Sequence, residues 1–335
     1  MSSCRSATPP VVASLAELLA GATDRVEVRT PDARSGARFE RLRIGGDPHF
    51  LKIVSPAADW IMRVCGDDGS FEVRAWQGGL YAAMPGVVDH AVVGMALEDT
   101  ADGPQLAILM TDRTADLVPP GDDVVPADHH ADWIDHMAAG HAHFLGWRDT
   151  LGLLPLARRF RFFAPATIAP ELAAPDVPGP VAVAHRGWGV LAERAPRLHG
   201  LVSAVHRDAD ALAEALRTTP GTFVAGDWKL GNVGRRPDGR TVLLDWLPGE
   251  APPAWDLVWY VALNRARLPE SKEATITRHR RRLEAHGVDT AGWWERQLGL
   301  CLVAAMATFG WEKAVGDAAE LEWWEEAALA GARRW

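Results

Sequence analysis

Two stretches of the sequence carry its chemistry, Val224-Ala-Gly-Asp-Trp-Lys-Leu-Gly-Asn-Val233 and Thr241-Val-Leu-Leu-Asp-Trp246. In the first, Asp227 and Asn232 are five residues apart, and a loop of this length can fold back to bring a carboxylate and an amide oxygen together. In the second, a short apolar strand ends in Asp245, where the carboxylate is held rigidly. One base and two oxygen ligands for a hard cation are groups that phosphoryl transfer requires.

Chance is the competing explanation for each stretch alone, because Gly-Asp turns and Asp-Trp pairs are common in loops. The two stretches occur in the required order, with Asn232 and Asp245 thirteen residues apart, which is much harder to obtain by accident. Between them, Pro237-Asp-Gly239 is a strong turn signal. We therefore expect short strands at 222–226, 232–236 and 241–245.

These residues resemble the aminoglycoside phosphotransferase and choline kinase-like family, which shares the protein-kinase fold. The family carries a Gly-Asp-x-x-x-x-Asn loop followed by two hydrophobic residues and Asp-Trp. Gly226-Asp227 and Asn232 match the first motif, and Leu243-Leu-Asp-Trp246 matches the second. The histidine that commonly precedes Gly-Asp in the family is Ala225 here.

The resemblance implies a role for each motif residue. Asp227 is the expected catalytic base, and Asn232 and Asp245 are the expected magnesium ligands. Lys229 occupies the place where protein kinases carry a lysine that neutralises charge on the transferred group, so we count it with the catalytic residues. The implied reaction moves the γ-phosphate of ATP to a hydroxyl of a small molecule, with Mg2+ as the metal.

Phosphoryl transfer also requires a lysine on a strand and an acidic partner on a helix. Two alternating runs, 39–44 and 49–53, flank Gly45-Gly-Asp47 and predict a hairpin whose second strand carries Lys52. Lys52 is the expected ligand of the α- and β-phosphates. An ordinary solvated strand lysine is the alternative, and its apolar neighbours argue against that.

The acidic partner of Lys52 is expected to be Glu72. Asp68-Gly-Ser70 provides helix-capping residues, which places Glu72 in the first turns of a helix. Asp59, on a predicted helix at 57–65, is the weaker alternative.

Two further strands are predicted at 91–97 and 105–110, and the linker between the lobes follows the second. The resemblance assigns adenine binding to backbone groups of Met110, Thr111 and Asp112. The loop that would cover the phosphates is 30–37, which contains one glycine, Gly36, and is a weak signal.

The predicted fold is α+β and bilobal, like a protein kinase, with a small N-terminal antiparallel sheet plus helix and a larger, mostly helical C-terminal part. The expected boundary divides the chain into 1–112 and 113–335. Apolar residues at three- and four-residue steps predict helices in the second part. These helices cover 127–145, 197–218, 253–268, 271–286, 290–309 and 317–334, with a short helix and a loop at 164–180. Asp256 matches a family aspartate that braces the catalytic loop.

Composition excludes some classes of function. The net charge of −9 disfavours a nucleic-acid partner, because phosphate contacts need clustered basic residues. The N-terminal run 11–22 resembles the core of a signal peptide, but Glu17 in its middle argues against that and its leucines predict a short amphipathic helix instead. No stretch approaches the roughly 20 apolar residues of a membrane span. Three widely spaced cysteines form no disulfide or metal pattern and fit a reducing cytoplasm.

Two residue types invite other interpretations. Five histidines at 129, 130, 136, 141 and 143 cluster on one predicted helix, and we interpret them as helix surface in preference to a zinc site. Fifteen tryptophans include the pairs Trp293-Trp294 and Trp323-Trp324. Adjacent residues on a helix point in different directions, so core packing is favoured over an aromatic binding box.

The sequence does not identify the acceptor molecule. Aminoglycosides, amino sugars and related natural products all offer hydroxyl groups, and the acidic residues near the C-terminus are equally well explained as solvated helix charge. A protein-kinase-like protein or a nucleotide-binding pseudokinase is the alternative function. The oligomeric state is unknown from sequence.

Overall fold

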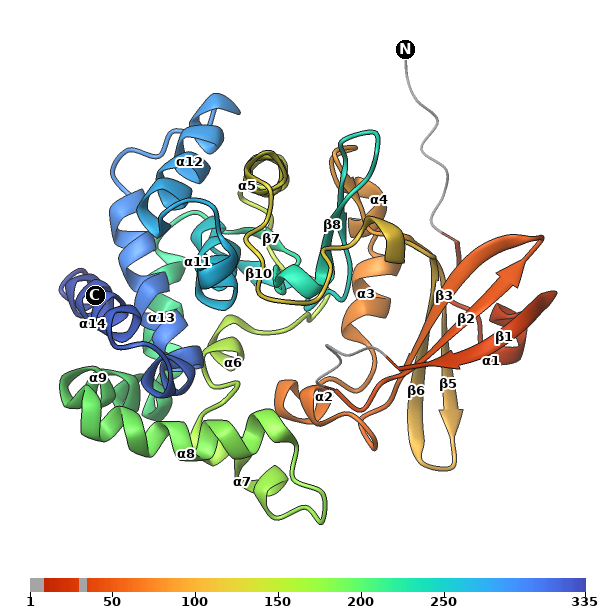
Figure 1. Ribbon diagram of the computed structural model, residues 1–335, viewed down its shortest axis with the longest axis horizontal. Helices are drawn as coiled ribbons and strands as arrows, with labels where there is room; N and C mark the ends of the chain where they lie inside the picture. The colour runs from red at the N-terminus through yellow and green to blue at the C-terminus, as the bar shows by residue number, and fades with distance from the viewer. Residues whose placement is uncertain (1–8, 30–34) are drawn as a thin grey trace.

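The computed structural model describes residues 9–29 and 35–335. An antiparallel sheet in the order β1-β2-β3-β6-β5 lies at one end of the molecule, and helices form the other end (Figure 1). Its strands are β1 (Ala22–Val28), β2 (Arg38–Ile44), β3 (Asp47–Val54), β5 (Val92–Thr100) and β6 (Gly103–Thr111). The predicted strands at 39–44, 49–53, 91–97 and 105–110 are confirmed.

The two faces of this sheet bury different residues because side chains alternate along each strand. Leu51 of β3 lies in a small hydrophobic cluster under α1 (Leu15–Leu18). Phe50 and Val54 instead pack on the main core. Lys52, between them, therefore points away from α1 and toward the helices that follow β3.

Three short helices connect β3 to β5. They are α2 (Trp60–Cys65), α3 (Phe71–Gln77) and α4 (Leu80–Ala83). Helix α2 begins three residues later than predicted, because Asp59 is its N-cap. At the start of α3, the Oδ1 of Asp67 accepts hydrogen bonds from the N–H groups of the next turn, which places Glu72 in the first turn as predicted.

The rest of the chain is mostly helical, as predicted. Its helices are α5 (Ala127–His143), α6 (Leu156–Phe160), α7 (Pro165–Leu172), α8 (Gly179–Arg194), α9 (Pro196–Arg207), α10 (Ala209–Arg217), α11 (Pro253–Asn264), α12 (Lys272–Ala285), α13 (Trp294–Val315) and α14 (Ala318–Ala332). Short 3-10 turns are η1 (Thr114–Asp116), η2 (Leu230–Asn232) and η3 (Arg265–Arg267). The single helix predicted at 197–218 is wrong, because the chain breaks at Asp208, which caps α10.

Helix α8 was not predicted, because the run contains Gly187 and Gly189, which disfavour a helix interior. The fold gives Gly187 a packing role. A Cβ at this position would lie 2.5 Å from the carbonyl oxygen of Trp311, so glycine permits the close contact between α8 and α13.

Helix α13 is long and apolar enough to cross a membrane by length and composition alone. In this molecule, however, 83% of its most apolar window is buried by neighbouring helices, as in the core helix of a globular protein. Helices α8, α9, α11 and α14 surround it.

Two small sheets position the loops that carry the motifs. One pairs β7 (Thr222–Val224) with β10 (Gly249–Ala251), and the other has the order β4-β9-β8, from β4 (Val88–Asp89), β9 (Thr241–Leu243) and β8 (Val233–Arg235). Strands β7, β8 and β9 are shorter than predicted, and β4 and β10 were not predicted. The domain boundary at residue 112 stays a prediction.

The histidine interpretation is partly wrong. His130 and His141 of α5 are buried, not on the helix surface. The Nδ1 of His130 lies 2.8 Å from the hydroxyl of Tyr260, so the polar ring is satisfied inside the core. The tryptophan interpretation is confirmed for Trp294 and Trp324, both of which are buried in the core.

Candidate active site

Backbone hydrogen bonds hold the two motif loops side by side. The N–H of Leu247 donates to the carbonyl of Ala225 at 2.7 Å, and the N–H of Leu244 donates to the carbonyl of Asn232 at 2.9 Å. Gly226 has a φ of +85°, and a Cβ there would lie 2.2 Å from the Leu247 oxygen. Glycine therefore permits the loops to approach this closely.

Asp227 lies just after β7 and is 8% exposed. Its Oδ2 accepts a hydrogen bond from the Nδ2 of Asn232 at 2.8 Å, and its Oδ1 accepts one from the Nε1 of Trp259 at 2.9 Å. The Nζ of Lys229 is 3.5 Å from Oδ2. Burial raises the pKa of Asp227, and the charge of Lys229 opposes that rise. An oriented carboxylate of raised pKa is suited to accept a proton.

Asp245 follows β9 with a φ of +57°, a backbone conformation that is uncommon outside glycine. Its side chain is 41% exposed, and its Oδ1 contacts the Nζ of Lys52 from β3. Partial desolvation by itself would raise the pKa of Asp245, but the charges of Lys52 and Lys229 outweigh it and lower that pKa. The carboxylate is therefore kept ionised and accessible.

Lys52 has Glu72 as its second carboxylate partner, with 3.9 Å between Nζ and Oε1. Burial would lower the pKa of Lys52, but Asp245 and Glu72 together raise it. Burial raises the pKa of Glu72 to about 7, against the effect of the Lys52 charge. Asp59 instead caps α2 by accepting from the N–H of Ile61 at 2.8 Å. The structure thus favours Glu72 over Asp59 as the partner.

The oxygen atoms of Asn232 and Asp245 suit a hard cation. Within residues 9–29 and 35–335, no three His, Cys, Asp or Glu side chains form a metal-binding cluster. Mg2+ that is bound through nucleotide phosphates needs only one or two protein ligands. The Nδ2 of Asn232 donates to Asp227, so the side-chain oxygen of Asn232 is the atom available to a metal. Asp245 supplies an ionised carboxylate. This donor set fits magnesium.

The predicted adenine-binding segment is the end of β6 and the residue after it. The N–H of Thr111 donates to the carbonyl of Ala91 at 2.9 Å, and the N–H of Asp112 donates to the carbonyl of Pro48 at 3.2 Å. Met110 is buried between neighbouring strands. The fold therefore already uses the amides of Thr111 and Asp112, and Met110 is paired with strands on both sides.

The loop predicted to cover the phosphates falls largely outside the described residues, since 30–34 are not among them. Its described end lies against the residues just before α2. A Cβ on Gly36 would be 1.9 Å from the carbonyl oxygen of Ala58, so the backbone contact here is close.

Asp256 on α11 braces the loop that carries Asp227, the structural role that the resemblance implied. Its Oδ1 accepts from the N–H of Gly226 at 3.2 Å, and its Oδ2 accepts from the Nε1 of Trp228 at 2.9 Å. The Nε2 of His141 lies 3.3 Å from the same Oδ2. Sequence reasoning missed His141, because no motif links it to a residue more than a hundred positions away.

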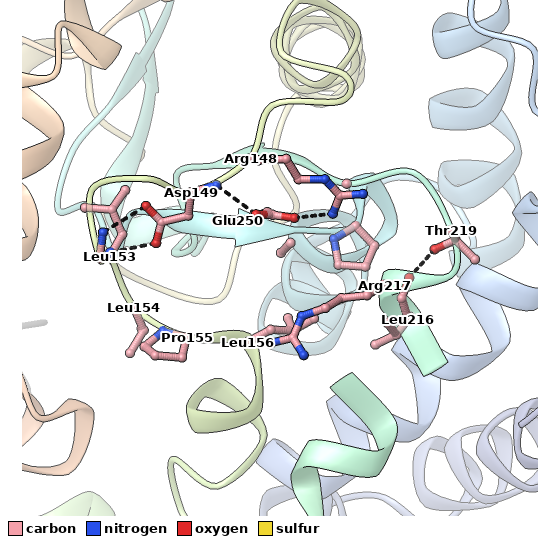
Figure 2. Close-up of a pocket in the computed structure, with 14 residues that line it drawn as sticks. Arg148, Asp149, Leu153, Leu154, Pro155, Leu156, Leu216, Arg217, Thr219 and Glu250 are labelled. Atoms are coloured by element: carbon pink, nitrogen blue, oxygen red, sulfur yellow. Dashed lines mark hydrogen bonds and ion pairs between the residues drawn. The ribbon is translucent and has the colours of Figure 1, made fainter. Parts of the chain in front are cut away.

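A cavity of about 360 Å³ lies between the 148–156 segment, α10 and β10 (Figure 2). None of the predicted site residues lines it. Its carboxylates already have partners, because Glu250 pairs with Arg148 at 2.6 Å and Asp149 accepts from the N–H groups of Leu151 and Leu153. The cavity is therefore separate from the cluster around Asp227 and shows no unmet demand for a ligand.

No protein-family model and no curated protein matches this sequence. Solved structures do match. The choline kinase LicA from Streptococcus pneumoniae is 11% identical, with 96% of each chain covered and a TM-score of 0.51. A microcompartment-associated aminopropanol kinase is 13% identical, with 92% of this chain and 90% of that chain covered and a TM-score of 0.51.

A spectinomycin phosphotransferase, solved with ADP and spectinomycin, is 12% identical over 95% of this chain and 98% of its own, with a TM-score of 0.50. At these identities the likeness shows the fold. The chain has the α+β, bilobal, protein-kinase-like fold that the motif residues predicted.

Proposed function

We propose that the chain is an ATP-dependent phosphotransferase that moves the γ-phosphate to a hydroxyl group of a small molecule. The observation that carries the proposal is the convergence of Lys52, Glu72, Asp227, Asn232 and Asp245 from separate segments, with the charge of Asp245 acting on both Lys52 and Asp227. The shared fold of a choline kinase, an aminopropanol kinase and a spectinomycin phosphotransferase supports transfer to a small molecule.

The nucleotide is held by three sets of groups. Lys52, oriented by Glu72, binds the α- and β-phosphates. The segment Met110 to Asp112 contributes backbone groups near the adenine. Asn232 and Asp245 would hold Mg2+, which would neutralise charge on the phosphates.

The transfer step follows from the position of Asp227. Its carboxylate orients the acceptor hydroxyl and takes the proton as the acceptor oxygen attacks the γ-phosphorus. The bond to the β,γ-bridging oxygen breaks, and ADP leaves. Lys229, which is close to Asp227, places a positive charge where the transferred group becomes more negative.

The acceptor class that we propose comprises aminoglycosides, amino sugars and related natural products with free hydroxyl groups. Support comes from the three kinases of this fold, each of which is named for a small hydroxylated or amino-alcohol compound. We place the reaction in the cytoplasm, where ATP is supplied.

A coupled ADP-release assay with Mg-ATP tests the proposal. The acceptors are aminoglycosides, amino sugars, choline-like alcohols and peptides, and nucleotide binding is measured separately by calorimetry. Wild-type protein should release ADP faster with at least one small-molecule acceptor, and Asp227→Ala should lose about a hundredfold or more in rate while still binding nucleotide.

Asp238→Ala, in the exposed turn between β8 and β9, is the matched control and should keep the wild-type rate. If Asp227→Ala transferred phosphate at the wild-type rate, Asp227 would not be the catalytic base. A chain that binds nucleotide but transfers to no acceptor would point to the pseudokinase alternative.

A further inference from the structure

Tyr81, on α4, is buried beside the carboxylate that orients Lys52. Its hydroxyl donates to the Oε2 of Glu72 at 2.8 Å, while the Oε1 of Glu72 faces the Nζ of Lys52. The two oxygens of one carboxylate therefore have separate partners. With Oε2 held by Tyr81, the rotation that would turn Oε1 away from Lys52 is opposed.

The ring of Tyr81 also contacts the second motif. It stacks on the indole of Trp246 with 4.2 Å between ring centroids and 15° between planes. Trp246 directly follows Asp245, and its Nε1 donates to the carbonyl of Leu243 in β9 at 2.8 Å. The stack thus connects α4 to the loop that presents Asp245.

Two further rings restrict Tyr81. His90 and Trp76 meet it edge-on, with centroids at 5.2 Å and 5.6 Å. His90 also meets Trp246 edge-on at 6.4 Å. A ring enclosed on three sides in a buried cluster has one available orientation, which directs its hydroxyl at Glu72.

We propose that Tyr81 is a positioning residue for nucleotide binding. It holds the Lys52–Glu72 pair and the Asp245 loop in a fixed position relative to each other. This inference rests on the proposed function, since it assigns Tyr81 to the same nucleotide site. The hydroxyl acts through Glu72 on the phosphate ligand Lys52. The ring acts through Trp246 on the magnesium ligand Asp245.

The chain contains two tyrosines, which provides a matched pair of variants. Tyr81→Phe removes the hydroxyl and keeps the stack on Trp246. Tyr260→Phe removes an equally buried hydroxyl, which lies on α11, 2.8 Å from the Nδ1 of His130, and not on the elements that carry Lys52 and Glu72. Both variants lose one buried hydrogen bond, so Tyr260→Phe controls for the stability loss that follows from removing a buried tyrosine hydroxyl.

Calorimetric titration with MgADP, which needs no acceptor, separates the two. Tyr81→Phe should weaken the Kd about tenfold, because a hydrogen bond to a carboxylate is lost, whereas Tyr260→Phe should bind as wild type. In kinetics with ATP, Tyr81→Phe should raise KM more than it lowers kcat. Equal binding by wild type and Tyr81→Phe would overturn the role of Tyr81.

A double-mutant cycle with Glu72→Ala tests the route of the effect. Because the hydroxyl acts through Glu72, Tyr81→Phe should cause no further loss of MgADP binding in the Glu72→Ala background. Full additivity would overturn the route. Trp246→Phe, which reduces the stacked surface, is the second variant and should also weaken MgADP binding; an unchanged Kd would overturn the coupling through the ring.

Failure of the proposed function is distinguishable from failure of this inference. A wild-type chain that binds no MgADP overturns the proposed function and the role of Tyr81 with it. If the wild type and Tyr81→Phe bind MgADP equally tightly, the nucleotide site is supported and only the role of Tyr81 is overturned.

Discussion

The Nζ of Lys52 contacts the Oδ1 of Asp245, although 193 positions separate the two residues in the sequence. Lys52 comes from the antiparallel sheet, and Asp245 follows a strand of the β4-β9-β8 sheet. Each residue influences the other, because Asp245 raises the pKa of Lys52 and Lys52 lowers the pKa of Asp245. The contact brings the expected phosphate ligand and the expected metal ligand to one point.

Nucleotide and metal should stabilise the folded chain together. At a free MgATP concentration a hundredfold above Kd, linkage predicts a gain of about 2.7 kcal/mol in the free energy of unfolding. EDTA should remove most of that gain, and Asp245→Asn should not respond to magnesium. Thermal unfolding of wild type and variant, with ATP alone and with MgATP, measures this. An equal shift with and without magnesium would contradict the metal assignment.

Glu72 should make stability depend on pH. Its folded pKa is raised to about 7, so between about pH 4.5 and 7 the folded chain holds a proton that the unfolded chain has released. Stability therefore falls as pH rises through this window. Glu72→Gln stays neutral, and its free energy of unfolding relative to wild type should improve by about 3 kcal/mol across the window.

Urea unfolding of wild type and Glu72→Gln at pH 5 and pH 8 gives this comparison. If the difference in free energy of unfolding between Glu72→Gln and wild type does not change from pH 5 to pH 8, burial does not raise the pKa of Glu72.

Gly226→Ala should be severely destabilising. A Cβ would meet the Leu247 carbonyl oxygen at 2.2 Å, and the residue has a positive φ, so the expected cost is about 3 kcal/mol or more. Gly239→Ala is the control, because its φ is +86° but no atom lies within 4 Å of the added Cβ, and about 1 kcal/mol is expected. Chemical denaturation measures both. Similar losses would show that the loop contact is not restrictive.

Asp256→Asn should loosen the loop that carries Asp227. The buried carboxylate accepts from Gly226 and Trp228, and an amide would present N–H groups where one acceptor is needed. We expect a loss of about 2–4 kcal/mol in stability and a lower kcat. Asp289→Asn, at an exposed loop position, is the control. Wild-type stability in Asp256→Asn would mean that the brace contributes little.

Local patterns were sufficient for much of the fold. The alternation around Gly45-Gly-Asp47 predicted the β2–β3 hairpin, and apolar periodicity predicted α5, α12 and α14 within a few residues. Strands β4 and β10 were missed because two or three residues carry no periodic signal. Helix α8 was missed because Gly187 lowers helix propensity at the position where close packing requires it.

The positions of the histidines show a second reason why the sequence alone was not sufficient. His130 and His141 have polar side chains, which by themselves indicate a helix surface. Tyr260 and Asp256, both on α11, supply partners that allow these rings to be buried. A polar residue is buried when the fold provides its hydrogen bonds, and those partners lie more than a hundred positions away.

By itself, the sequence determined which chemical groups the chain brings to its site, because short motifs specify residue types whose chemistry does not depend on the fold. Only the tertiary structure decided that Glu72 and not Asp59 faces Lys52, that Asp227 is buried with a raised pKa, and that Tyr81 connects Glu72 to Trp246. The distances between these side chains, and their burial, arise only when remote segments of the chain pack together. Those distances decide which groups pair, and burial shifts the pKa values of Glu72 and Asp227.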